Sequence, residues 1–117
     1  MGKGNPPKDA FDGNDDTRWA TDQKGAWVSE EMEKLTTAKA VAIQWYNGSK
    51  RNYSFKIQTS INGKKWRTVY QGTSGKKNDF EVYPFDQPHE LSHYRVVCEG
   101  HNGTAWSSII DMHLEEN

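Results

Sequence analysis

The chain has 117 residues and a formal net charge of −1 at pH 7, and this length fits one domain of ordinary size. Acidic and basic residues are interspersed along it and no apolar run approaches the roughly 20 residues that cross a bilayer, which argues against nucleic acid and membrane as partners. The mean hydropathy is -1.00, but five Trp, five Tyr and four Phe predict an aromatic core rather than disorder.

The chain begins with a polar segment that we expect to be a tail or linker over residues 1–7. Pro6-Pro7 favours an extended entry before the first apolar pair, Ala10-Phe11. We therefore expect one domain over residues 8–117. The N-terminus lacks the apolar region of a signal peptide, although a leader removed from the chain would leave export open.

A loop rich in oxygen-bearing side chains follows, with the sequence Asp12-Gly13-Asn14-Asp15-Asp16-Thr17 before Arg18-Trp19. A hard cation such as calcium takes roughly six to eight oxygen ligands, and Asp12, Asn14 and Thr17 are suited to supply some of them. The loop is not an EF-hand, because the Glu at the twelfth position and the following helix are missing. An Asx-turn cluster without metal is the alternative interpretation.

Alternating apolar residues predict short strands through the rest of the chain. The candidates are residues 26–28, 41–45, 53–60, 66–70, 80–83, 94–98 and 109–114. Asn62-Gly63 predicts a hairpin, residues 30–35 fit either one helical turn or a charged edge segment, and the Pro-flanked residues 84–88 are expected to separate two strands. About seven or eight short strands without a convincing helix predict an all-β sandwich of two antiparallel sheets.

No catalytic motif is found, and the single cysteine, Cys98, allows no internal disulfide. It lies in an apolar alternation, which predicts a small buried side chain. His89 and His93 flank a Pro-bounded segment and are expected to be solvated.

Two loops have a composition typical of recognition. Residues 46–52 combine Tyr46 and Asn52 with the basic pair Lys50-Arg51, and residues 101–106 combine His101 and Asn102 with Trp106. Arginine forks two hydrogen bonds onto a carboxylate or onto vicinal hydroxyls. Either loop alone is better explained as an ordinary solvated turn, and the case for recognition comes from the two together.

A set of segments in a specific order and spacing carries a family resemblance across residues 10–114. They are Ala10-Phe11-Asp12-Gly13-Asn14, Thr17-Arg18-Trp19, Trp27, Tyr53-Ser54-Phe55-Lys56-Ile57, Ser60-Ile61-Asn62-Gly63-Lys64-Lys65-Trp66, Tyr94-Arg95-Val96-Val97 and Trp106-Ser107-Ser108-Ile109-Ile110-Asp111. With them the chain resembles the discoidin, or coagulation factor 5/8 type C, superfamily, and within it the family 32 carbohydrate-binding modules. Residues 46–51 and 99–106 look most like the modules attached to alginate lyases and related bacterial polysaccharide lyases.

The resemblance implies a β-jelly-roll sandwich without catalysis. It also implies a secreted or cell-surface bacterial protein, here expected to be a monomer, that holds an attached catalytic domain on its polysaccharide.

The resemblance further implies a structural calcium that ties the two ends of the domain together. The implied ligands are the carbonyls of Asp9, Asn14 and Ile110, the carboxylates of Asp12 and Asp111, and the carbonyl and hydroxyl of Thr17. The family more often has Glu at the position of Asp111.

The implied sugar site lies on the loops at one end of the sandwich, where the seven loop residues converge with residues 22–24. They are Tyr46, Lys50, Arg51, Asn52, His101, Asn102 and Trp106. We expect Arg51 to grip a uronate carboxylate or two hydroxyls and Trp106 to stack on a pyranose. Galactose-type sugars are the alternative ligand. Less favoured alternatives are a protein- or lipid-binding discoidin domain and a small lyase that uses His101 with Tyr46 and Arg51.

Strand phase and the family's core positions together predict the core. We expect largely buried side chains at Trp19, Trp27, Trp45, Phe55, Ile57, Trp66, Val82, Val96 and Ile110, with Trp106 outside the core.

Overall fold

A computed structural model describes residues 19–116, and within them the chain is almost entirely β-structure. The strands are β1 (Trp19–Thr21), β2 (Ala26–Trp45), β3 (Tyr53–Ser60), β4 (Arg67–Thr73), β5 (Glu81–His101) and β6 (Ser107–Glu116), and η2 (Gly48–Lys50) is a single 3-10 turn. No helix in this range has the length and apolarity to cross a membrane. The predicted all-β class is confirmed.

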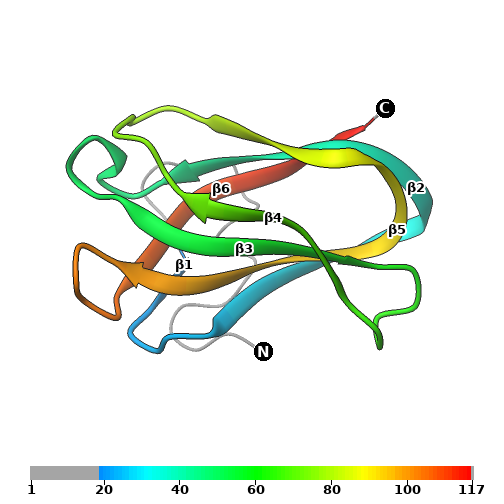
Figure 1. The fold of residues 1–117 in the computed structure, drawn as a ribbon, viewed down its shortest axis with the longest axis horizontal. Coiled ribbons are helices and arrows are strands. Elements are labelled where there is room, and N and C mark those ends of the chain that lie inside the picture. The colour runs from blue at the N-terminus through cyan, green and yellow to red at the C-terminus, as the bar shows by residue number, and fades with distance from the viewer. Residues whose placement is uncertain (1–18, 117) are drawn as a thin grey trace.

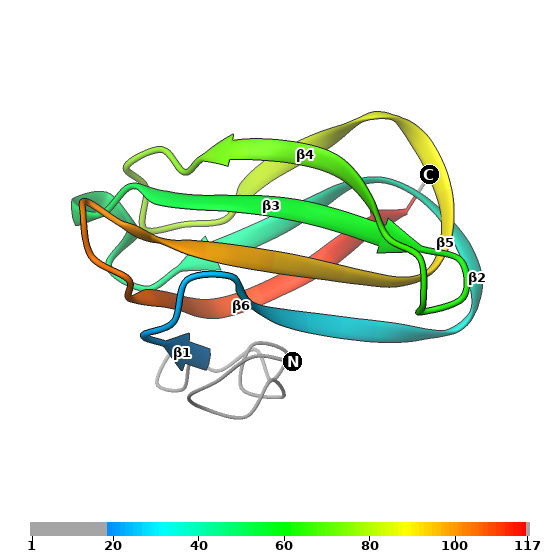
Figure 2. The same ribbon diagram turned by 60° about the horizontal axis from the view of Figure 1, so that its bottom comes forward.

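The strands form one six-stranded antiparallel sheet in the order β1-β6-β2-β5-β3-β4, which folds over on itself. The long strands β2 and β5 pair with each other and curve together at one end, so each contributes to both layers (Figure 1). One layer holds β4, β3 and the paired first half of β2 and second half of β5; the other holds β1, β6 and the remaining halves. Figure 2 shows the two layers facing each other. The predicted sandwich is therefore confirmed, with one continuous hydrogen-bonded sheet in place of two separate ones.

Residues 30–35, for which the sequence allows two interpretations, and residues 84–88, expected to separate two strands, both belong to strands. Residues 30–35 lie in β2 and residues 84–88 lie in β5, where the paired strands bend and their register shifts. Pro84 pairs with Ala40 of β2, and in this half β5 has no partner on its other side within the described residues. Proline lacks a backbone N–H and is tolerated at such an edge. The separate short strands of the prediction are therefore joined into two long ones.

Aromatic side chains fill the core between the layers, as predicted. Trp45 is 2% exposed and stacks on Tyr53 with ring centroids 4.5 Å apart. Its indole nitrogen donates to the Tyr83 hydroxyl over 2.9 Å, which satisfies the polar end of a buried ring. Burial and the neighbouring Glu81 carboxylate raise the pKa of Tyr83 far above its ordinary value, so this hydroxyl stays protonated. Phe55 packs edge-on against Tyr83 at 4.6 Å.

The core prediction is right for five residues, wrong for Val82 and not met by Trp27 and Trp66. Trp45, Phe55, Ile57, Val96 and Ile110 are buried. Trp27 and Trp66 are only half-buried, and the side chain of Trp19 lies outside the described part of the chain.

The prediction placed Val82 on the wrong face of its strand. It is 56% exposed, while Tyr83 and Phe85 are 4% and 7% exposed. Both phases of this segment carry apolar residues, and burial of the two aromatic rings removes more apolar area from water than burial of one valine.

Three smaller predictions can also be compared with the structure. Cys98 is fully buried, as expected, and burial raises the pKa of its thiol to about 12. The hairpin around Asn62-Gly63 is confirmed by the antiparallel pairing of β3 with β4, with Thr59 opposite Arg67. His89 is not solvated: it is 9% exposed, and its Nε2 lies 2.7 Å from Oδ1 of Asp86.

Candidate functional site

Two loops meet at the end of the sandwich opposite the bend of β2 and β5. Residues 46–52 connect β2 to β3, and residues 102–106 connect β5 to β6 (Figure 1). Tyr53 at the start of β3 is paired with His101 at the end of β5. The backbone N–H of Asn52 donates to Oδ1 of Asn102 over 2.9 Å. The sheet register and this hydrogen bond therefore hold the two loops side by side.

The shape of each loop depends on a glycine. Gly100 has a φ of +96°, and a Cβ there would collide with the carbonyl oxygen of Thr104. That close approach lets His101 and Thr104 exchange two backbone hydrogen bonds of 3.1 and 2.8 Å across the turn. In the other loop, a Cβ on Gly48 would collide with the carbonyl oxygen of Lys77. Both turns are therefore tightly determined.

A depression of about 440 Å³ lies between the loops. Its lining residues are Ala20, Tyr46, Arg51, His101, Thr104, Trp106 and Ser108. Four of the seven residues expected to bind ligand therefore come together: Tyr46, Arg51, His101 and Trp106. Trp106 is 52% exposed, so a large part of its ring is open to a ligand.

Arg51 is oriented by two tyrosines. Its Nη1 donates to the Tyr53 hydroxyl over 3.0 Å, and that hydroxyl donates to the carbonyl of Tyr46 over 2.6 Å. The guanidinium also lies over the Tyr46 ring, 5.3 Å from its centroid. Among the described residues no carboxylate forms an ion pair with Arg51. Its remaining N–H groups are thus available for an anionic or hydroxyl-bearing ligand.

His101 is held in one tautomer by the loop that it begins. Its Nδ1 lies 2.6 Å from the carbonyl oxygen of Trp106, and a carbonyl only accepts, so Nδ1 carries a hydrogen. In the neutral ring, Nε2 is then left as an acceptor. The ring also packs against Tyr53 with centroids 5.0 Å apart. His101 therefore offers a fixed acceptor for a ligand hydroxyl.

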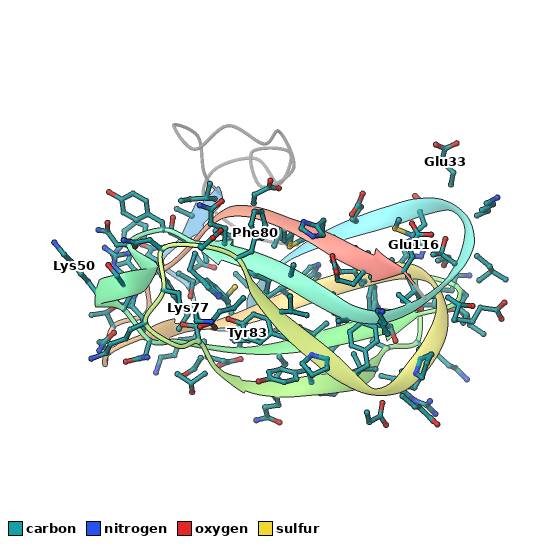
Figure 3. The ribbon with its side chains drawn as sticks, turned by 90° about the horizontal axis from the view of Figure 1, so that it is seen from above. Glu33, Lys50, Lys77, Phe80, Tyr83 and Glu116 are labelled. Carbon is teal, nitrogen blue, oxygen red and sulfur yellow. The ribbon has the colours of Figure 1, made fainter. Side chains whose placement is uncertain are left out.

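The other three predicted ligand residues do not line the depression. Lys50 is exposed on η2 and points away from the body of the protein (Figure 3). Asn52 Nδ2 donates to the carbonyl of Ser74 over 2.7 Å, and Asn102 Oδ1 accepts from the backbone of Asn52. The two asparagines therefore position the loops. Residues 22–24 are exposed and also lie outside the lining.

Three lining residues had no signal in the sequence. Ala20, Thr104 and Ser108 are small, and their types alone do not suggest recognition. Ala20 of β1 pairs with Ser108 of β6 at the inner side of the depression. The Oγ of Ser108 is buried without a hydrogen-bond partner among the described residues.

Most of the expected calcium ligands cannot be compared with the structure. Asp9, Asp12, Asn14 and Thr17 lie outside the described residues, whereas Ile110 and Asp111 lie on β6. The register pairs Trp19 with Ile109. This brings the start of β1, two positions after Thr17 in the sequence, next to the strand that carries Ile110 and the half-buried Asp111. The calcium site itself stays a prediction.

Comparison with known proteins agrees with the fold. The model of the F5/8 type C domain matches residues 1–112. The chain belongs to the F5/8 type C family. A search of curated proteins finds no match to this F5/8 type C domain.

Solved structures of family 32 carbohydrate-binding modules (CBM32) are similar to this F5/8 type C domain. The CBM32 of AlyQ in complex with 4,5-unsaturated mannuronic acid is 30% identical, with a TM-score of 0.90 over 97% of this chain and 88% of that one. A truncated AlyQ with CBM32 and alginate lyase domains is 30% identical, with a TM-score of 0.89 over 100% of this chain and 31% of that one. The family 32 module of NanJ from Clostridium perfringens in complex with galactose is 23% identical, with a TM-score of 0.77 over 94% and 84%, and shares the fold.

Proposed function

We propose that the chain is a non-catalytic carbohydrate-binding module that holds an acidic sugar in the depression between residues 46–52 and 101–106. The observation that carries the proposal is the convergence of Arg51, Tyr46, His101 and Trp106 around one open hollow. The similarity to the AlyQ module, whose structure contains 4,5-unsaturated mannuronic acid, supports an acidic sugar such as a residue of alginate.

Each residue of the depression has a role that its surroundings favour. Arg51 donates two parallel hydrogen bonds to a uronate carboxylate, because Tyr53 and Tyr46 fix the guanidinium while leaving donors unpaired. Trp106 packs its exposed ring on the C–H face of the pyranose, and Nε2 of His101 accepts from a hydroxyl. An open site with few polar contacts binds weakly, with a Kd of roughly millimolar to tens of micromolar.

We further propose the setting in which such a weak site is useful. A module of this kind, attached to a polysaccharide-degrading enzyme outside the cell, raises the local concentration of substrate at the catalytic domain. The similarity to a chain that contains CBM32 and alginate lyase domains supports such an arrangement.

A structural calcium that involves β6 completes the proposal. Ile110 and Asp111 would hold it together with Asp9, Asp12, Asn14 and Thr17. Oxygen ligands of this kind suit calcium. When bound, the ion joins the start of the domain to its last strand.

A titration distinguishes an acidic sugar from a galactose-type sugar. Trimannuronate and galactose are titrated by calorimetry into the wild type and into Arg51→Ala. We expect trimannuronate to bind the wild type, with an affinity that falls as salt is added because the charge-assisted bonds are partly exposed. Arg51→Ala should weaken this binding on the order of tenfold to a hundredfold.

Each other outcome has a definite meaning. Binding of galactose without trimannuronate would assign the depression to neutral sugars, since arginine also grips vicinal hydroxyls. Binding of trimannuronate that is unchanged in Arg51→Ala would place the site elsewhere.

A further inference from the structure

A second arrangement of arginine and aromatic rings lies away from the depression between residues 46–52 and 101–106, here called the loop-end depression. The Cζ atom of Arg95 is 4.7 Å from the ring centroid of Trp27 and 4.1 Å from that of Trp66. Arg95 lies on β5, where it pairs with Ser29 of β2 and Gln58 of β3. Trp27, Arg95 and Trp66, here called the Arg95 platform, therefore come from three segments that are distant in the sequence.

The Arg95 platform lies on the outer face of the layer that contains β3. The residues next to Trp27, Arg95 and Gln58 in the sequence are fully buried. They are Val28, Val96 and Ile57. Successive side chains of a strand point to opposite faces, so Trp27 and Arg95 point away from the core. Both are half-buried rather than covered. The platform is thus accessible to a ligand from solution.

The guanidinium of Arg95 is fixed but not neutralised. Its Nε donates to Oε1 of Gln58 over 2.8 Å, and the two indoles hold the planar group between them. Among residues 19–116 the ion pairs all involve histidine, so no carboxylate is paired with Arg95. Partial burial lowers the pKa of this guanidinium from its ordinary value, as expected for a charge moved out of water. It remains charged, and its two terminal amino groups have no partner in the described residues.

The charges around the platform favour an anion. Lys56 lies on the same outer face of β3. It is two residues before Gln58 in the sequence and is opposite Val97 in the register. On this outer face the acid closest to Arg95 in the register is Glu31, which is opposite His93, and the His93 Nε2 lies 3.7 Å from its carboxylate. Arg95 and Lys56 therefore face outward here, and the closest carboxylate on this face lies beside His93 rather than beside Arg95.

We propose that the Arg95 platform is a second binding site, for a carboxylate-bearing sugar of an acidic polysaccharide. The terminal amino groups of Arg95 donate to the carboxylate as a fork, and the exposed parts of Trp27 and Trp66 pack on the sugar ring. The choice of an acidic sugar rests on the proposed function, because the loop-end depression combines the same elements, a fixed arginine over an aromatic ring beside an exposed tryptophan.

The two sites are placed to act on one polymer. Arg95 and His101 lie on the same strand, and at ~3.3 Å per residue they are roughly 20 Å apart. A polysaccharide has repeated carboxylates, so a module with two weak sites binds a polymer more tightly than either site binds an oligosaccharide. A short oligosaccharide should therefore fill the two sites independently.

The tryptophans themselves report on the two sites. The chain has five tryptophans, and each gives one indole N–H signal in a 15N-correlated NMR spectrum. Trp106 reports on the loop-end depression, and Trp27 and Trp66 report on the platform. We expect trimannuronate to shift the Trp106 signal along one saturable curve and the Trp27 and Trp66 signals along another. Neutral mannotriose at matched ionic strength should leave Trp27 and Trp66 unshifted.

Three variants make the test specific. Arg95→Gln should abolish the shifts of Trp27 and Trp66 while the Trp106 titration stays as in the wild type, which also shows that the variant is folded. Arg95→Lys keeps the charge without the fork and should weaken the platform on the order of tenfold. Lys34→Gln removes an equal charge from an exposed part of β2 and should change neither curve.

The outcomes separate this inference from the proposed function. If trimannuronate shifts Trp106 but leaves Trp27 and Trp66 unchanged in the wild type, the second site does not exist and the proposed function stands. If Trp27 and Trp66 shift while Trp106 does not, the proposed depression is wrong and the platform is the sugar site. Equal shifts of Trp27 and Trp66 with mannotriose would overturn the role of the carboxylate.

Discussion

Trp45 and Trp106 show how differently one residue type is used in the core and at the loop end. The indole of Trp45 is 2% exposed, stacks on Tyr53 and donates its N–H to Tyr83. The indole of Trp106 is 52% exposed at the edge of a hollow. A buried ring with a satisfied polar end contributes to stability, whereas an exposed ring beside a fixed arginine contributes to recognition. Stability and binding should therefore respond to different substitutions.

Trp45→Ala should have the largest effect on stability. Removing a fully buried indole leaves a cavity and deletes the hydrogen bond to the Tyr83 hydroxyl, so we expect a loss of about 3–5 kcal/mol in the free energy of unfolding. That is a large part of the 5–15 kcal/mol typical of a domain. Urea unfolding followed by circular dichroism measures it, and a loss of less than about 1 kcal/mol would contradict the assigned core.

Removal of calcium should lower stability without moving the loop-end site. A cation that binds only the folded state adds RT ln(1 + [L]/Kd), about 2.7 kcal/mol at a hundredfold excess over Kd. Thermal unfolding with added calcium and with chelator measures the difference in midpoint, and Asp111→Ala is expected to abolish it. A midpoint that is the same in both buffers would remove calcium from the proposal.

Tyr83→Phe tests how much the buried hydrogen bond between Trp45 and Tyr83 contributes to stability, separately from the packing of the rings. The substitution keeps the ring but deletes the hydroxyl that accepts from Trp45 and donates to Glu81. A buried donor left without a partner costs about 1–3 kcal/mol. Chemical denaturation should show a loss of this size, with trimannuronate affinity unchanged. An unaltered unfolding midpoint would mean that the Trp45 N–H finds another acceptor.

Trp106→Ala is the opposite test, with an expected change in binding and almost none in stability. An exposed side chain contributes little to folding, so the free energy of unfolding should stay within about 0.5 kcal/mol of the wild type. Loss of ring packing on the sugar should weaken trimannuronate binding on the order of tenfold. Calorimetry and urea unfolding on the same sample measure both quantities, and a stability loss comparable to that of Trp45→Ala would place Trp106 in the core.

The sequence predicts the fold well where one phase of a strand is clearly apolar. Phe55 and Ile57 alternate with polar residues, and both are buried as expected. Around Val82 both phases are apolar, so alternation cannot select the face, and the larger rings of Tyr83 and Phe85 occupy the core. The continuity of β2 and β5 was hidden by charged residues and prolines, which are tolerated where the strands bend and β5 forms an edge.

The site was predictable only in part, for a similar reason. Composition identifies the loops and the large side chains, and Arg51 and Trp106 do line the depression. It cannot say which polar groups are already bonded inside the protein. Asn52 and Asn102 were predicted from composition as ligand residues, and only the structure shows that their hydrogen bonds hold the loops in place. Small residues such as Ser108 carry no signal until β6 is placed beside β1.

The paired strands β2 and β5 also bear on how the chain folds. They are distant in the sequence, each belongs to both layers, and β3 and β4 lie between them in the chain. The β3–β4 hairpin is local, but neither layer is complete until the long-range pair of β2 and β5 has closed, which costs chain entropy before contacts repay it. We therefore expect slow folding in a single cooperative step, and no state in which one layer survives the loss of the other.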